Sequence, residues 1–171
     1  DAMGHCSTLA YDGAYNTGGR ATTFHRMPGE PSLLLAGIEG SPRYNKGPHQ
    51  YTEPEVEFRL LRMAPGLILN RVRKGRYLDI FVTHAPPRGI HDLEDIAHKG
   101  FQSFLPFLKY FRPTLMLHGH THRYDPTQPT RTQHNDTLII NVYGHTRFDI
   151  RFSSEIRRWQ LVTKPLAVGN P

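Results

Sequence analysis

Two short apolar runs in this chain each stop at a histidine, and they constrain the fold more tightly than any other feature. Residues 115–117, Leu-Met-Leu, run directly into His118-Gly119-His120-Thr121-His122. Upstream, the mainly apolar residues 77–83 end at His84, just before Ala85-Pro86-Pro87. Short apolar runs that glycine or proline terminates are typical of buried strands. We therefore expect two strands whose ends carry these histidines.

The spacing of the histidines is that of metal ligands. Side chains on one face of a strand recur every second residue, so His120 and His122 can both reach one small dinuclear cluster. Gly119 lets the backbone approach a bound ion closely. Because ligands of α/β sheets gather at the carboxyl ends of strands, we expect His84 and His120 to meet there. His118 is interpreted as a structural or supporting residue.

Two segments have the apolar spacing of helices. The first opens at Glu53-Pro54-Glu55, where proline and carboxylates suit a first helical turn. Its expected apolar stripe comprises Val56, Leu60, Leu61 and Ala64. We expect the helix to restart at Pro65, continue over residues 66–74 and stop at Gly75. The second segment, residues 101–111, carries phenylalanine and leucine at helical spacing.

The remaining apolar runs predict strands. They cover residues 33–38, 138–143, 148–152 and 156–162, whereas residues 1–32 and 124–136 are expected to be mainly loop. Strands and helices therefore alternate through the middle of the chain, and strands alone follow. This order favours an α/β fold with short parallel strands and an antiparallel end, in which Trp159 lies in the core.

Composition restricts the class of protein. The chain has 171 residues, enough for one domain with a sizeable core, and a formal net charge of +6, which suits phosphates or nucleic acid. A single cysteine, Cys6, excludes an internal disulfide framework. No apolar run approaches the ~20 residues that a membrane helix needs. We expect a cytoplasmic protein without a membrane partner.

Thr83-His84-Ala85-Pro86-Pro87, followed by Gly119-His120-Thr121-His122, resembles the last two metal-binding motifs of the calcineurin-like metallophosphoesterases. The resemblance implies the α/β sandwich of that family, with helices packed on β-sheets. It also implies two divalent ions, of Mn, Fe, Zn or Ni, with His84 and His120 on one ion and His122 on its neighbour. A bridging hydroxide would attack phosphorus while a protonated histidine assists the leaving oxygen.

The earlier motifs of the family, Asp-x-His and Gly-Asp-x-x-Asp, do not occur before His84. Gly4-His5 is the one candidate for the third motif. His5 then either replaces the ligand asparagine of the family or is its catalytic histidine, and we take His5 as the catalytic candidate. We expect residues 1–171 to be one metallophosphoesterase-like domain that lacks its N-terminal part, with the first strands and motifs upstream.

The resemblance implies a hydrolase acting on phosphate mono- or diesters, through a dinuclear site that upstream residues complete. Its partner would be a phosphate-ester substrate, a nucleotide being one option, and nucleic acid is less favoured. Two alternatives stay open. In the first, the chain is a degenerate member of the fold that serves as a binding or regulatory module. In the second, it is a mononuclear zinc-binding protein built on the three histidines.

Overall fold

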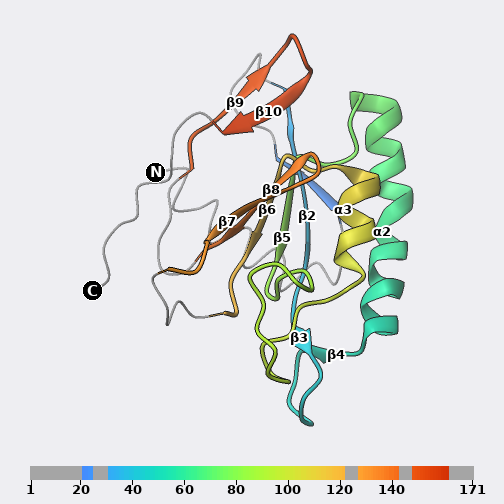
Figure 1. Ribbon diagram of the computed structural model, residues 1–171. Coiled ribbons are helices and arrows are strands. Elements are labelled where there is room, and N and C mark those ends of the chain that lie inside the picture. The colour runs from blue at the N-terminus through green and yellow to red at the C-terminus, as the bar shows by residue number, and fades with distance from the viewer. Residues whose placement is uncertain (1–20, 25–30, 122–126, 143–147, 162–171) are drawn as a thin grey trace.

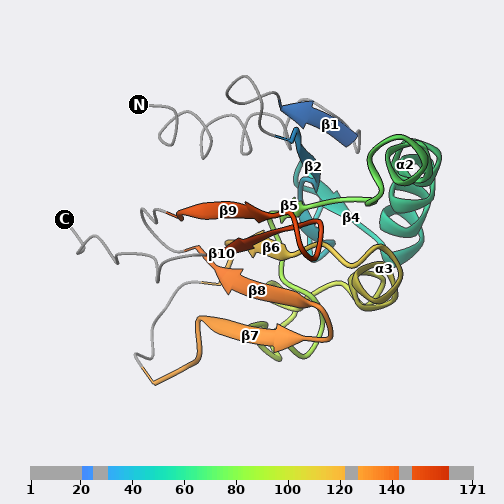
Figure 2. The same ribbon diagram turned by 90° about the horizontal axis from the view of Figure 1, so that it is seen from above.

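The computed structural model describes residues 21–24, 31–121, 127–142 and 148–161. Within these residues the chain forms a six-stranded sheet in the order β1-β2-β5-β6-β8-β7 (Figures 1 and 2). The four central strands run parallel, while β1 and β7 pair antiparallel at the edges. The strands are β1 (Ala21–Phe24), β2 (Leu33–Ile38), β5 (Ile80–Thr83), β6 (Leu115–His118), β7 (Arg131–His134) and β8 (Thr137–Asn141).

Two helices, α2 (Glu53–Lys74) and α3 (Phe104–Phe111), cover one face of this sheet (Figure 1). Large buried side chains fill the space between them and the sheet, among them Phe81, Leu67, Phe104, Met116 and Ile139. Phe81 of β5 packs edge-on against Phe104 of α3, with ring centroids 5.5 Å apart. Burial of this apolar surface fixes the helices against the parallel strands.

The opposite face of the sheet is covered by β9 (Ile150–Ser153) and β10 (Arg158–Leu161), an antiparallel pair (Figure 2). Trp159 of β10 is 3% exposed and belongs to an apolar cluster with Leu35, Ile80 and Leu115. The prediction that Trp159 is a core residue is confirmed. A further small parallel pair, β3 (Ser41–Pro42) and β4 (Gln50–Tyr51), lies just before α2.

The structure corrects the prediction for the first helix. α2 is one continuous helix that passes through Pro65 and ends at Gly75, whose φ is 78°. The buried side chains of α2 are Val56, Leu60, Met63 and Leu67. Leu61, which was expected on the buried stripe, is 69% exposed. Tertiary packing on the sheet therefore overrides the break that Pro65 alone would favour.

The α/β prediction with short parallel strands is confirmed, and the strands expected near residues 33–38, 77–83 and 138–143 are present as β2, β5 and β8. Strand β7 lies within residues 124–136, which were expected to be loop, so that expectation is wrong there. The sequence of β7, Arg-Thr-Gln-His, contains no apolar residue and gives no strand periodicity. Its pairing with β8 places it in the sheet.

Candidate metal centre

The two histidine motifs meet at the carboxyl edge of the sheet. β5 and β6 are parallel neighbours, with Val82 opposite Leu117, so both chains leave the sheet at the same edge. The backbone N–H of Gly119 donates to the carbonyl of His84 at 3.1 Å. This bond joins the two loops directly beyond the strands, as expected for side chains that follow adjacent parallel strands.

His84 and His120 converge in this loop region. Nε2 of His84 lies 3.0 Å from Nδ1 of His120. Nε2 of His120 lies 2.7 Å from the carbonyl oxygen of Ala97. Since a carbonyl can only accept, the proton of a neutral His120 ring is on Nε2, and its Nδ1 presents a lone pair toward His84. The structure thus brings together the two histidines that the sequence predicted to meet.

This arrangement fits a divalent metal ion. Two imidazole nitrogens bound to one zinc ion at about 2.0–2.1 Å lie roughly 3 to 3.4 Å apart, and the observed separation is 3.0 Å. A histidine ligand commonly donates its other N–H to a backbone carbonyl, which is what His120 does with Ala97. Burial, followed by the charge of His120, lowers the pKa of His84 to about 4. His84 is therefore neutral at pH 7, as a metal ligand must be.

The backbone at His120 departs from strand geometry. β6 ends at His118, and His120 has a φ of 67°, in the left-handed region. Strand alternation therefore does not continue from His118 to His120. A Cβ added at Gly119 would meet no atom within 4 Å, so open space adjoins the backbone at this point. Gly119 has room for a ligand or ion close to the main chain.

His118 belongs to a separate buried network. It is 2% exposed, and its Nδ1 lies 3.0 Å from the carbonyl oxygen of Gly119. Its Nε2 lies 2.9 Å from Nδ1 of His91, and Nε2 of His91 lies 2.8 Å from the hydroxyl oxygen of Thr132. Because the Gly119 carbonyl can only accept, it fixes the direction of these three hydrogen bonds. Thr132 donates to His91, His91 donates to His118, and His118 donates to Gly119.

Burial keeps this network neutral. It lowers the pKa of His118 to about 3, and burial also lowers the pKa of His91. The supporting role expected of His118 is consistent with these contacts, because the network ties the ends of β6 and β7 together. Sequence reasoning missed His91, which has a φ of 62° and follows no periodic pattern. It also missed Ala97, because no sequence signal reveals a backbone carbonyl acceptor.

The loop that carries Ala97 is held by Asp92. Its carboxylate accepts hydrogen bonds from the N–H groups of Gly89 and Gly100, at 2.9 and 3.0 Å, and from Arg88 at 2.6 Å. Arg88 also pairs with Glu94 at 2.8 Å. Asp92 is therefore a loop-organising residue. The ring of His98 lies 5.2 Å from that of His120, centroid to centroid.

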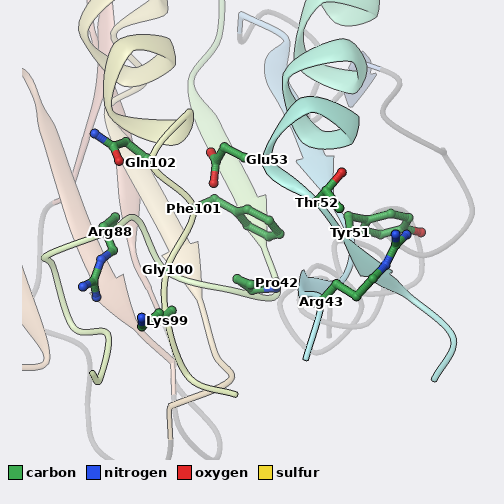
Figure 3. Close-up of a pocket in the computed structure, with 10 residues that line it drawn as sticks. All are labelled: Pro42, Arg43, Tyr51, Thr52, Glu53, Arg88, Lys99, Gly100, Phe101 and Gln102. Carbon is green, nitrogen blue, oxygen red and sulfur yellow. The ribbon is translucent and has the colours of Figure 1, made fainter. Parts of the chain in front are cut away.

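The same loop lines a cavity of about 320 Å³ between it and the start of α2 (Figure 3). The charged side chains of its lining are Arg43, Arg88, Lys99 and Glu53. Three of these four carry positive charge, which suits an anionic ligand. Arg43 and Arg88 also have carboxylate partners, at Glu55 and at Asp92 and Glu94.

His122 and His5, the other two predicted site residues, lie outside the described residues. Within the part of the chain that the structure describes, no group of three histidine, cysteine or carboxylate side chains is arranged to hold a metal ion. No helix among those residues is long and apolar enough to span a membrane. The described centre therefore consists of the His84 and His120 pair and its supports.

Solved structures with a similar arrangement share little sequence with the chain. The protein TT1561 of Thermus thermophilus is 15% identical with a TM-score of 0.42, over 82% of this chain and 56% of that one. GAP50, the anchor in the inner membrane complex of Plasmodium, is 15% identical with a TM-score of 0.36, over 71% of this chain and 35% of that one. The chain thus spans little more than half of the one and about a third of the other. A comparison with curated proteins finds no match.

The sequence pattern of the calcineurin-like phosphoesterase family matches residues 6–124. That range contains His84, His120 and the loop between β5 and α3. Members of this family generally bind divalent metal ions, in accord with two imidazoles that converge at the carboxyl edge of the parallel sheet. The match extends over well more than half of the 171 residues, and the chain belongs to the calcineurin-like phosphoesterase family.

Proposed function

We propose that this chain is part of a metal-dependent hydrolase that cleaves phosphate mono- or diesters. Family membership supports a metallophosphoesterase type of function. The single observation that carries the proposal is the 3.0 Å approach of His84 Nε2 to His120 Nδ1, with the other nitrogen of His120 bonded to a carbonyl. Such a pair can present two imidazole lone pairs to one cation.

In this proposal His84 and His120 hold one divalent ion, and His122 holds its neighbour. The bound ions would supply Lewis acidity and a nucleophile at neutral pH. The Ala97 carbonyl fixes the tautomer and orientation of His120. His5 is the proposed general acid that donates a proton to the leaving oxygen.

The proposed substrate is anionic, and the cavity beside the loop supports that. Arg43, Arg88 and Lys99 would attract a phosphate ester toward the edge of the sheet. Two imidazoles contribute no negative charge, so further ligands, carboxylates above all, are proposed to come from residues beyond those described. Mn, Fe, Zn and Ni all accept imidazole together with carboxylate.

Hydrolysis of p-nitrophenyl phosphate and of its bis ester tests the proposal. The chain is assayed alone and with any coding sequence that precedes Asp1, each with Mn, Zn, Ni or Fe added. We expect metal-dependent hydrolysis in the longer form, lost in His84→Ala and His120→Ala and kept in His134→Ala, which alters a histidine on β7 outside the pair. Hydrolysis that is indifferent to both His84→Ala and His120→Ala would contradict the proposal. Metal binding without hydrolysis in any form would favour a binding module.

A further inference from the structure

The face of α2 that points away from the sheet carries an apolar stripe. Phe58, Leu61, Pro65, Ile68 and Val72 follow one another at intervals of three, four, three and four residues. This spacing keeps all five on one side of a helix. Phe58, Leu61, Ile68 and Val72 are 61%, 69%, 49% and 77% exposed.

The core does not account for this stripe, because a different set of α2 residues faces the sheet. Val56, Leu60, Met63 and Leu67 are the buried residues of α2. Among the described residues nine large apolar side chains are exposed, and five of them, with Leu69 the fifth, lie on α2. Their concentration on one helix marks an interaction surface, since scattered exposed apolar residues need no partner but a contiguous set does.

The interval pattern indicates that the partner is another helix. Alternating steps of three and four residues form the seam along which two helices pack side by side. Here the seam runs from Phe58 to Val72. Near its middle the exposed residues are the compact Pro65 and Gly66, which has no side chain, so a second helix can approach closely there.

Charge indicates which helix fits. The first turns of α2 are acidic, with Glu53, Glu55 and Glu57, and its last turns are basic, with Arg71, Arg73 and Lys74. A copy of α2 that runs in the opposite direction sets the acidic first turns of one helix against the basic last turns of the other and also opposes the two helix dipoles. An antiparallel second copy therefore meets complementary charge at both ends of the helix, while Arg59 and Arg62 add positive charge nearer its middle.

We propose that α2 is the interface of a two-fold symmetric homodimer, in which it packs antiparallel against α2 of a second copy. The arrangement is self-complementary about the middle of the stripe: Phe58 lies toward the Ile68 and Val72 end of the other helix, and the reverse holds by symmetry. The interface lies on the outer side of the helix layer (Figure 1), whereas the histidines lie at the edge of the sheet. The dimer is thus independent of metal binding and of the proposed hydrolysis.

Sedimentation velocity of the 171-residue chain tests association. A dimer is expected in the micromolar range, and Leu61→Lys and Val72→Glu should each raise the dissociation constant by more than about tenfold, because a charge replaces a side chain buried on pairing. Ile96→Lys is the matched control, since Ile96 is 67% exposed but lies off the helix. It should leave the dimer intact. A monomer at every concentration up to hundreds of micromolar, or equal weakening by Ile96→Lys, overturns the proposal.

Disulfide trapping tests orientation in a Cys6→Ser background. A mixture of Phe58→Cys and Val72→Cys chains is expected to cross-link with each other under mild oxidation. Phe58→Cys alone should not, because the two copies of residue 58 lie at opposite ends of an antiparallel pair. Self-cross-linking of Phe58→Cys without the mixed product would mean parallel helices and would overturn the antiparallel arrangement. Circular dichroism of each variant confirms that it is folded.

Discussion

The carbonyl of Ala97 decides which nitrogen of His120 faces His84. It lies 2.7 Å from Nε2, so the proton of the neutral ring is held there and Nδ1 is left with a lone pair. His118 has the opposite arrangement, because its Nδ1 lies 3.0 Å from the Gly119 carbonyl. Two histidines separated by one glycine thus present different nitrogens to different neighbours.

These assignments predict opposite tautomers. In chelator-treated protein at neutral pH, long-range nitrogen-carbon correlation spectra should report the Nε2–H form for His120 and the Nδ1–H form for His118. The physical reason is the carbonyl acceptor that each ring contacts. The same tautomer at both rings would show that one of the two carbonyl bonds does not exist in solution.

The buried histidines make the stability of the fold depend on pH. The pKa values of His84, His91 and His118 are all lowered from 6.5 by burial, so between pH 6.5 and their folded pKa values the unfolded chain binds more protons than the folded one. Their contribution to stability is complete above the unfolded pKa of about 6.5 and declines as pH falls. In that window each group lowers the free energy of unfolding by about 1.4 kcal/mol for every unit by which the pH falls.

Urea unfolding at a series of pH values without metal measures this loss. His118→Gln keeps a donor and an acceptor but cannot titrate, so its unfolding free energy should fall less steeply below a pH of about 6.5. An identical slope in wild type and variant would contradict a neutral buried His118.

At the residue scale the sequence predicted the pairing of His84 with His120 because both follow apolar runs that enter one sheet. It could not predict the network of His91, since two left-handed residues, His91 and His120, redirect the chain after regular structure has ended. Local periodicity carries no information about such turns.

Among the elements, the loop between β5 and α3 supports the His84 and His120 pair most directly. Within this loop Gly100 lies so close to Pro87 that an added Cβ would be 2.5 Å from the Pro87 carbonyl carbon. Gly100→Ala should therefore displace the loop that carries Ala97, and it should weaken zinc binding by roughly 10- to 100-fold without altering a ligand. Calorimetric titration measures the change.

Gly89→Ala is the matched control for that variant. Gly89 has a φ of 80° in the same loop, but its added Cβ would meet no atom within 4 Å. We expect a loss of about 1 kcal/mol in unfolding free energy from the strained backbone, and unchanged metal affinity. If both variants bind zinc like wild type, the loop does not position His120.

Asp79 anchors the start of β5 to its neighbours. Its carboxylate is 2.7 Å from Arg76 Nε and accepts from the N–H of Leu34 at 2.8 Å. Desolvation raises the pKa of this carboxyl. Asp79→Ala would leave Leu34 N–H and the largely buried guanidinium of Arg76 without this carboxylate, at a cost of about 3–5 kcal/mol in unfolding free energy. Asp79→Asn keeps an acceptor and should lower the unfolding free energy clearly less. Equal losses in the two variants would show that the hydrogen bonds of the Asp79 carboxylate do not stabilise the fold.

Sequence patterns predicted most elements but not all of their limits. α2 was recognised from its first-turn residues, among which Glu55 accepts from the Thr52 N–H at 2.7 Å and from its hydroxyl at 2.9 Å. The break expected at Pro65 does not occur. The α2 sequence has two apolar stripes, and a single chain gives no means of deciding which of them faces the core, so Leu61 was assigned to the wrong one.

For the whole molecule, the order of apolar runs was enough to predict a parallel sheet with helices, because alternating strands and helices have few packing solutions. The order of apolar runs could not predict β7, because this strand has no apolar residue and enters the sheet by pairing with the neighbouring strand β8. His84 and His120 meet at the carboxyl edge of this parallel sheet, within the residues that match the family.

In the proposed site, the His84 and His120 side chains bind one divalent ion together. Calorimetric titration of the 171-residue chain with zinc at neutral pH tests it most directly. We predict that binding is weakened by more than about tenfold in His84→Ala and equally in His120→Ala, with no change in His134→Ala. Zinc affinity in either His84→Ala or His120→Ala equal to that of wild type would contradict the account.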